Sequence, residues 1–487
     1  MIKLQSLRFF PIQPKRKDSV RLAGWGSICA VLAFCAAMAA ALRAQTFDTL
    51  LSFDGSNGVT PNGLVQGADG ALYGTTIGGG ANGQGTVFRI TTAGAVTTLY
   101  SFCSQTNCDD GQLPRAGLML ATDGNFYGTT TFGGTGETGT VFKITPSGTL
   151  TTLHSFVYPE GSYPYAGLLE ANGNFYGTTF GGSKNGYGTV FEITPAGVLT
   201  TLYLFCSLPN CADGEDPYAG LIQAANGNFY GTAEYGGTSN AGTVFELSPS
   251  GAFTAVYSFC ALRNCFDGER PDGGVIQAAN GNIYGTTGEG GAKGWGTVFE
   301  IDPAGTLTTV GGFDGTDGAG IASLVQGTNG NFFGVTADGG LYGEGNVFEM
   351  TSAGGPSTLY SFCSVTDCPD GQQPLAALIQ ATDGNFYGTA SAGGAYTGGT
   401  VFSLSVGLGP FVETLPTVGM VGEQVVILGT DLAGATSVSF NGTAAVFTVK
   451  SGTEITTSVP AGATTGKLEV TTPGRTLESN LAFRIRP

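Results

Sequence analysis

The chain has few charged residues, a single histidine and two tryptophans. Charged side chains make up 11% of its 487 residues, against about 25% in an average soluble domain. Yet 41% of the residues are hydrophobic and 11% aromatic, which excludes a typical disordered protein, because such chains are poor in aromatics. Glycine is abundant at 83 residues, but it follows no three-residue period, so collagen is excluded as well.

Sequence signatures of catalysis and helix formation are also missing. The chain contains no nucleophile elbow, no HExxH and no P-loop. We therefore assign no catalytic residue, no metal ligand and no cofactor. The abundance of aromatics, Val, Thr and Gly instead favours short strands joined by tight turns.

Beyond residue 44 no apolar run is long enough to span a membrane. Residues 1–44 contain a basic leader, an apolar run over residues 22–42 and a small residue, Ala44, before Gln45. This layout predicts a cleaved secretory signal; the alternative is an uncleaved anchor, because the run is long enough to span a bilayer.

The predicted mature protein is strongly acidic. The leader holds seven Lys and Arg and one Asp, so its removal changes the net charge from −17 to −23. This charge disfavours nucleic acids and anionic lipid surfaces as partners. This negative net charge is explained more simply by solubility outside the cell than by a role in attracting ligands.

The body of the chain repeats one unit seven times. Each copy contains a variant of the text "DGNFYGTT". Its central aromatic recurs at spacings of 54, 49, 54, 54, 49 and 54 residues, at Tyr73, Tyr127, Tyr176, Tyr230, Tyr284, Phe333 and Tyr387. A period near 50 residues is typical of a repeat architecture.

Each unit predicts four strands, which we name a to d. In the second unit these are residues 116–121, 125–130, 139–145 and 149–156. Asp123-Gly124 between strands a and b is a two-residue hairpin signal. The sequence Pro-Ser-Gly at residues 146–148 predicts the turn between strands c and d.

Four-stranded units of this length fit the blades of a β-propeller; the rival is a parallel β-helix, whose coils are usually shorter. The seventh unit stops after strand c at residues 399–405, whereas an extra strand, residues 47–53, precedes the first strand a. Pairing that strand into the last blade would close a ring and remove an exposed sheet edge. We therefore predict an all-β fold with a seven-bladed propeller closed by the N-terminal strand.

Eight cysteines outside the leader form four C-x4-C pairs, each just after strand d. They occur in the four 54-residue steps and are absent from the two 49-residue steps. This predicts a lengthened loop stapled by a disulfide in an oxidising compartment, with the pairs Cys103–Cys108, Cys206–Cys211, Cys260–Cys265 and Cys363–Cys368. The rival, a metal site, is disfavoured because the lone His154 stands where other units have Tyr.

From residue 409 the repeat gives way to short alternating strands and turns. This pattern predicts a small β-sandwich. We thus expect a signal peptide at residues 1–44, the propeller at residues 45–408 and the sandwich at residues 409–487.

Both parts resemble known families. The "DGNFYGT…GG…GTVF-x-ITPSG" unit across residues 47–405 resembles the GloVer tandem repeat of secreted bacterial proteins. The features "VVILGTDL", "SVSFNGTAA" and "VPAGATTGKLEVTT" make residues 411–485 similar to an IPT/TIG immunoglobulin-like domain. The first resemblance implies export and no particular reaction; the second implies a spacer or adhesion module.

Candidate ligand-binding residues gather on one face of the predicted propeller. The b–c and d–a loops share this face and vary in length, whereas the a–b and c–d turns on the opposite face are short and uniform. Exposed aromatics beside carboxylates suit sugars or a protein surface, although inter-blade packing explains them too. The candidates are Trp295, Tyr187, Tyr342, Tyr396, Glu234, Glu289 and Glu344.

An acidic residue precedes glycine in every d–a loop. Turn formation explains this pattern; the alternative is a cation site, because Ca²⁺ prefers clustered oxygen ligands. The positions are Asp54, Asp110, Glu160, Asp213, Asp267, Asp314 and Asp370.

The sequence favours a secreted or cell-surface binding or adhesion protein without catalytic activity. Its expected partners are an extracellular glycan or a protein surface, and we expect it to be monomeric. The alternative is an extracellular glycan-cleaving enzyme that uses carboxylates of the loop face.

Overall fold

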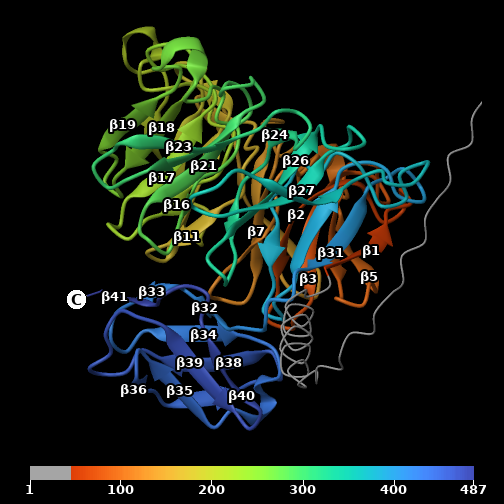
Figure 1. The fold of residues 1–487 in the computed structure, drawn as a ribbon, viewed down its shortest axis with the longest axis vertical. Helices are drawn as coiled ribbons and strands as arrows, with labels where there is room; N and C mark the ends of the chain where they lie inside the picture. Colours follow the sequence, from red (N-terminus) through yellow and green to blue (C-terminus); the bar gives the residue numbers. More distant parts are fainter. Residues whose placement is uncertain (1–44, 487) are drawn as a thin grey trace, which may run out of the picture. The chain divides into compact units, whose positions relative to one another are not determined.

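The computed structural model describes residues 45–486, which form seven antiparallel blades and a C-terminal β-sandwich (Figure 1). We number the blades 1 to 7 in the chain order of their strand b. The predicted signal peptide, residues 1–44, lies outside the described residues. Within the described part, no helix has both the length and the apolar character needed to cross a membrane.

Hydrogen bonds join the strands of each blade in the order a, b, c, d. Strands a are β2 (Val59–Gln66), β6 (Met119–Leu120), β11 (Leu169–Ala171), β16 (Ile222–Gln223), β20 (Ile276–Gln277), β25 (Val325–Gln326) and β29 (Ile379–Gln380). Strands b are β3 (Leu72–Gly78), β7 (Phe126–Thr130), β12 (Asn174–Thr179), β17 (Phe229–Ala233), β21 (Ile283–Thr287), β26 (Phe332–Asp338) and β30 (Phe386–Ala390). Strands c are β4 (Thr86–Ile90), β8 (Thr140–Ile144), β14 (Thr189–Ile193), β18 (Thr243–Leu247), β22 (Thr297–Ile301), β27 (Asn346–Met350) and β31 (Thr400–Ser405). Strands d are β5 (Val96–Ser101), β9 (Leu150–Ser155), β15 (Leu199–Leu204), β19 (Phe253–Ser258), β23 (Leu307–Gly312), β28 (Ser357–Ser361) and, in blade 7, β1 (Thr46–Ser52).

The repeated text encodes the packing of strands b and c. Every residue of β7 is buried, because blades pack against both of its faces. Gly128 lies opposite Phe142 of β8, and an added Cβ at Gly128 would lie 2.6 Å from the Phe142 ring. The glycine of "FYGT" therefore makes room for the phenylalanine of "TVF".

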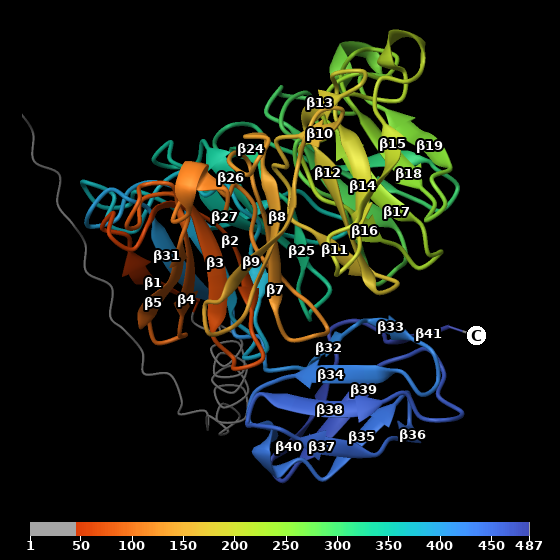
Figure 2. The same ribbon diagram turned by 180° about the vertical axis from the view of Figure 1, so that it is seen from behind.

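Strand β1 completes blade 7, as the displaced strand predicts. It pairs antiparallel with β31, from Thr46 opposite Ser405 to Ser52 opposite Thr400. The two strands lie side by side in both views (Figures 1 and 2). Phe47 of β1 stacks on Tyr360 of blade 6 with a ring-centroid distance of 3.7 Å. The fold is thus a seven-bladed propeller closed by its N-terminal strand.

A repeated threonine hydrogen bond links neighbouring blades and runs around the ring. The hydroxyl of a threonine in strand b donates to a carbonyl of the next blade, in the segment that leads into strand a or, in blade 1, within β2. These bonds are Thr75 to Ala116 (2.7 Å), Thr129 to Ala166 (3.0 Å), Thr178 to Ala219 (3.0 Å), Thr232 to Gly273 (3.1 Å), Thr286 to Ala322 (3.4 Å) and Thr389 to Asn62 (3.1 Å). The last of them joins blade 7 to blade 1, so the ring is closed at its inner side as well.

Four local features differ from the predicted pattern. Strand a of blade 2 was expected over residues 116–121, but β6 covers Met119–Leu120. Three of the four cysteine loops contain a single 3₁₀ turn: η1 (Thr106–Cys108), η2 (Pro209–Cys211) and η3 (Arg263–Cys265). Blade 3 adds a small antiparallel pair, β10 (Glu160–Ser162) with β13 (Gly181–Ser183), which joins its d–a and b–c loops. Blade 6 adds β24 (Ala319–Ile321) before its strand a.

The C-terminal domain is a β-sandwich with its own core. One sheet contains β32 (Glu413–Leu415), β34 (Gln424–Leu428), β38 (Glu454–Ser458) and β37 (Phe447–Val449). The other contains β36 (Thr443–Ala444), β35 (Ser437–Phe440), β39 (Leu468–Thr472) and β40 (Arg475–Glu478). A parallel pair, β33 (Val418–Gly419) with β41 (Arg484–Ile485), and the 3₁₀ turn η4 (Leu432–Gly434) complete it. Val425, Ile427, Phe440 and Phe483 are buried in the core that the two sheets share.

Hydrogen bonds connect this domain to a–b turns of the propeller, within one compact unit formed by residues 45–487. Thr453 donates to the Ala68 carbonyl over 2.6 Å, and the Phe411 amide donates to the Thr382 carbonyl over 3.0 Å. The a–b turns of blades 1 and 7 are therefore engaged by the C-terminal domain. Neither of these two hydrogen bonds involves the loop face.

Candidate functional site

In each repeat one residue lies close to the axis of the propeller, and these residues differ in their chemistry from blade to blade. This position follows the proline that ends the d–a loop; blade 6 has Ile321 in place of that proline. The neighbours of this position are uniform, small or aliphatic residues, whereas the position itself holds six different residue types in the seven blades. We call these seven the ring residues: Asn62, Arg115, Tyr165, Tyr218, Asp272, Ala322 and Leu375.

A left-handed backbone residue holds each ring residue in place. It lies just before the proline, and six of the seven are not glycine: Thr60, Leu113, Tyr163, Asp216, Arg270 and Gln373, each with φ between 53° and 57°. Such a conformation costs on the order of 1–3 kcal/mol and persists only where surrounding contacts impose it. Here the amide of Arg270, for example, donates to the Ala241 carbonyl of the preceding blade over 2.9 Å.

A cavity of about 500 Å³ is lined by five of the seven ring residues, all except Asn62 and Arg115. Residues from six of the seven blades line it, which places it at the propeller axis. Its polar and aromatic lining is Tyr165, Tyr218, Glu234, Asp272, Ser323 and Asp338. Because these residues come from d–a and b–c loops and the adjoining strand ends, the cavity opens at the loop face; we call it the channel mouth.

The aromatic part of the channel mouth is a pair of tyrosines. The rings of Tyr165 and Tyr218 lie 5.2 Å apart at an interplanar angle of 32°. The Arg115 guanidinium covers Tyr165 at 5.5 Å from the ring centroid, and Phe180 packs edge-on against Tyr165 at 5.1 Å. Tyr218 remains 40% exposed, so an aromatic face is available to a ligand.

The acidic part of the channel mouth is held in place by one arginine. Arg270 binds Glu234 and Glu289 at 2.6 Å each and covers the Tyr235 ring at 5.2 Å from its centroid. Glu234 is buried, and this ion pair compensates its charge. Arg270 therefore fixes Glu234 while leaving the neighbouring Asp272 without a salt bridge.

Asp272 is a desolvated carboxyl with an unused acceptor. Burial raises its pKa to about 6, and the negative charge of Glu234 adds to the rise. Its Oδ1 atom is buried and has no hydrogen-bond partner among the described residues. Burial also raises the pKa of Asp216 to about 6, with contributions from Glu215 and Glu234. Asp272 also lines the cavity, so a ligand that brings a hydrogen-bond donor can approach its carboxyl group, and a small rotation of that group would let Oδ1 accept as well.

Of the seven predicted ligand-binding residues, the structure places one, Glu234, in the channel mouth. Glu289 binds Arg270 nearby, and Glu344 is half-buried in its b–c loop. The four aromatics lie on b–c loops outside the cavity lining, with exposed fractions of 49% for Trp295, 39% for Tyr187, 48% for Tyr342 and 65% for Tyr396. The Trp295 indole lies against Gly315 of the next blade, where an added Cβ would come within 3.2 Å of it.

Sequence reasoning missed Tyr165, Tyr218 and Asp272. These residues can be recognised by comparing the repeats with one another. The residues on either side of this position are nearly the same in every copy, whereas the residue at the position varies. A comparison of the seven copies at each position would have singled it out.

The acidic residues of the d–a loops accept hydrogen bonds from residues of their own loops and of the preceding strand d. Asp110 accepts hydrogen bonds from the Tyr100 hydroxyl (2.7 Å) and the Ser104 amide (2.9 Å), and Asp213, Asp267 and Asp370 accept from the equivalent tyrosines. Asp54 and Asp314 accept from amides within their own turns. In the d–a loop between blades 2 and 3, Glu160 lies 2.7 Å from His154 of β9, so the histidine replaces the usual tyrosine. These bonds agree with the turn interpretation of the pattern.

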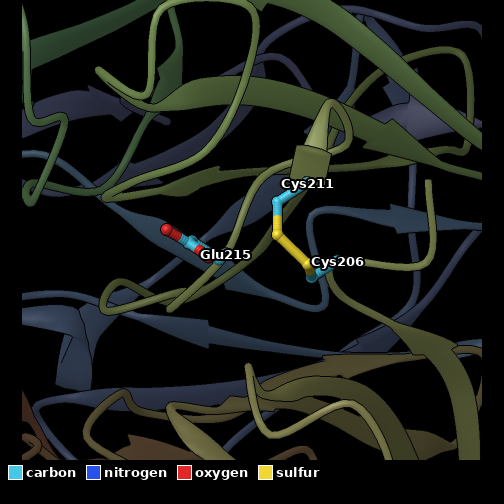
Figure 3. A group of neighbouring side chains, drawn as sticks. All are labelled: Cys206, Cys211 and Glu215. Carbon is cyan, nitrogen blue, oxygen red and sulfur yellow. A yellow bond between two sulfur atoms is a disulfide. The ribbon is translucent and has the colours of Figure 1, made fainter. Parts of the chain in front are cut away.

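The structure joins each C-x4-C pair by a disulfide: Cys103–Cys108, Cys206–Cys211, Cys260–Cys265 and Cys363–Cys368. Two of them lie beside a carboxylate, Glu215 next to Cys206 and Cys211 (Figure 3) and Glu269 next to Cys260 and Cys265. Because the sulfurs are bonded to each other, neither group offers the thiolates that a metal would require.

Comparisons with known proteins agree with this architecture. Residues 38–221, 107–266 and 207–402 match the Gloeobacter/Verrucomicrobia repeat, and residues 411–485 match the IPT/TIG domain. Among curated proteins none matches the chain.

Several solved structures are similar to the chain over much of its length, at low sequence identity. A puromycin hydrolase is 12% identical, with 77% of this chain and 59% of that chain covered and a TM-score of 0.46. The periplasmic gluconolactonase of Pseudomonas aeruginosa is 16% identical, with 69% and 97% covered and a TM-score of 0.40. An auxiliary nutrient binding protein of Bacteroides thetaiotaomicron is 12% identical, with 74% and 76% covered and a TM-score of 0.40. These distant likenesses leave the activity open, but the repeat matches extend over residues 38–402, and the chain belongs to the Gloeobacter/Verrucomicrobia repeat family.

Proposed function

We propose that the protein is a secreted, non-catalytic binding protein that holds a glycan at the channel mouth. The observation that carries this proposal is a cavity of about 500 Å³ in which a tyrosine pair adjoins carboxylates. A sugar ring can stack on an aromatic face while its hydroxyls donate to nearby acceptors. Tyr218 offers the face, and Asp272 offers the acceptor.

Export is supported by the four disulfides, which persist in oxidising compartments. The predicted leader at residues 1–44 fits the same interpretation. The C-terminal domain engages a–b turns, so a ligand on the loop face would not compete with it.

The proposal is tested by binding of the purified protein to a panel of glycans and cell-wall polysaccharides, with Tyr218→Ala as the diagnostic variant. We expect affinity to fall at least about tenfold, because truncation of a central aromatic anchor typically costs 2 kcal/mol or more. Tyr396→Ala, the same change on an exposed b–c loop, and Ser147→Lys on a c–d turn serve as matched controls. Loss of binding in Tyr396→Ala with full binding in Tyr218→Ala would move the site to the loop tips.

One observation favours the alternative, a glycan-cleaving enzyme. A carboxyl with a pKa near 6, such as Asp272, is protonated often enough at neutral pH to act as a general acid. Glu234 would then be the second carboxylate. However, Glu234 is tied to Arg270, which limits its service as a base or nucleophile. Turnover of a polysaccharide by the wild type, abolished in Asp272→Asn, would establish the enzyme and overturn the binding proposal.

A further inference from the structure

The channel mouth has more negative than positive charge available to a ligand. Glu234, Asp272 and Asp338 line it. Arg270 is already engaged by Glu234 and Glu289, and Arg115 lies over Tyr165. Neither arginine forms a salt bridge with Asp272 or Asp338. The two carboxylates therefore form no salt bridge within the described residues, although the positive charge of Arg270 partly offsets the effect of Glu234 on the pKa of Asp272.

Asp272 in particular needs a donor. Its Oδ1 is buried without a hydrogen-bond partner, and a buried acceptor left unpaired costs free energy. The nearby charge of Glu234 adds repulsion when Asp272 ionises. A ligand ammonium group would supply three donors and a positive charge at once. A hydroxyl would supply one donor and no charge.

The tyrosine side of the channel mouth also favours a ligand ammonium group. Tyr218 is beside Asp272 in the lining of the cavity and keeps 40% of its surface exposed. Aromatic faces attract cations through the ring quadrupole and stack on sugar rings. A tyrosine pair next to unpaired carboxylates thus matches a ligand with both a sugar ring and a cationic substituent.

We infer that the channel mouth selects an amino sugar whose amino group is free, with the ammonium directed at Asp272 and the sugar ring against Tyr218. This inference rests on the proposed glycan-binding function and names its ligand class. Asp272 is the residue that distinguishes a free amine from an acetylated one, because N-acetylation removes the charge and two of the donors.

The test compares three hexasaccharides at pH 7 by isothermal titration calorimetry: β-1,4-linked glucosamine, β-1,4-linked N-acetylglucosamine and β-1,4-linked glucose. We expect the glucosamine oligomer to bind at least about tenfold more tightly than the acetylated one, since the pairing of a desolvated charge exceeds about 1.4 kcal/mol. In Asp272→Asn this preference should vanish, with the affinity for the acetylated oligomer retained.

The net charge of the protein could itself attract a polycation, so a matched control is required. Asp302→Asn removes the same charge from the c–d turn of the same blade, where Asp302 accepts from the Ala304 amide at 2.9 Å. We expect this variant to keep the full preference. A preference that persists in Asp272→Asn, or that falls equally in Asp302→Asn, would show that attraction is non-specific and would overturn the inference.

The two proposals fail in distinguishable ways. Equal affinity for the three oligomers would overturn the amino-sugar inference and leave glycan binding standing. No binding of any oligomer would overturn the inference; the wider panel, read with Tyr218→Ala, then decides separately whether the channel mouth binds another glycan. An amide is nearly isosteric with a neutral carboxyl, so Asp272→Asn should fold.

Discussion

Burial opposes the charge of Asp272, and this makes it the ring residue with the clearest consequence for stability. Its pKa of about 6 in the folded protein lies above the ordinary value of 3.8. Folding therefore favours the neutral carboxyl, and the folded protein loses stability as the pH rises from about 4 to above 6. A residue that lowers stability at neutral pH without a local partner is expected at a binding site.

Asp272→Asn should remove this loss. We expect the variant to gain on the order of 2–3 kcal/mol over the wild type between pH 4 and pH 7.5, because each unit of pKa shift corresponds to about 1.4 kcal/mol. Urea unfolding at the two pH values measures the difference, in which the other titrating groups cancel. A stability difference that stays constant with pH would contradict the assignment of a raised pKa to Asp272.

At the scale of strands and turns, much could be predicted because the information is local. The "FYGT" and "GTVF" texts, the Asp-Gly and Pro-x-Gly turns and the cysteine spacing each specify structure within a few residues. Strand a was predicted too long because residues 116–118 approach the axis, after the left-handed Leu113 and Pro114, and pair with no strand. The ring residues were missed for a related reason: they meet only when seven segments, about 50 residues apart in sequence, converge.

The threonine bonds between blades should contribute little individually. Blade 6 has Val335 where other blades have the threonine, so the ring already tolerates one missing bond. We expect Thr389→Val to cost about 1 kcal/mol, the usual net worth of one hydrogen bond, as measured by urea unfolding. Thr232→Val, in the middle of the array, should cost the same; a much larger effect of Thr389→Val would show that the blade 7 to blade 1 junction is the weak point of the ring.

The disulfides should rigidify their loops more than they stabilise the fold. Each closes a short loop, for which the entropy gain is about 2 kcal/mol at most, and the d–a loops after β9 and β23 fold without one. We expect Cys363→Ser with Cys368→Ser to lower the free energy of unfolding by about 2 kcal/mol or less and to increase amide exchange in that loop. Non-reducing peptide mapping should give the four local links; links between blades would contradict the structure.

The molecule as a whole depends on β1 for the integrity of its ring. Phe47 packs on Tyr360 of blade 6 and lies 5.2 Å from Phe402 of β31. We expect Phe47→Asp to expose the edge of β31 and to produce oligomers, since unpaired edges recruit other strands. Size-exclusion chromatography and thermal unfolding test this. Asp48→Ala changes an exposed residue of the same strand and should leave the protein monomeric, whereas a monomeric Phe47→Asp variant of normal stability would mean that β1 is dispensable.

The pairing of β1 with β31 also ties folding to the order of synthesis. The first propeller strand to leave the ribosome has its partner at Thr400–Ser405, so it must wait until the last repeat has been made. A chain that stops early would keep an unpaired strand at each end of its array and would remain a target for proteases. The pairing therefore acts as a check on the completeness of the repeat array: only a chain that includes the last repeat can pair both end strands.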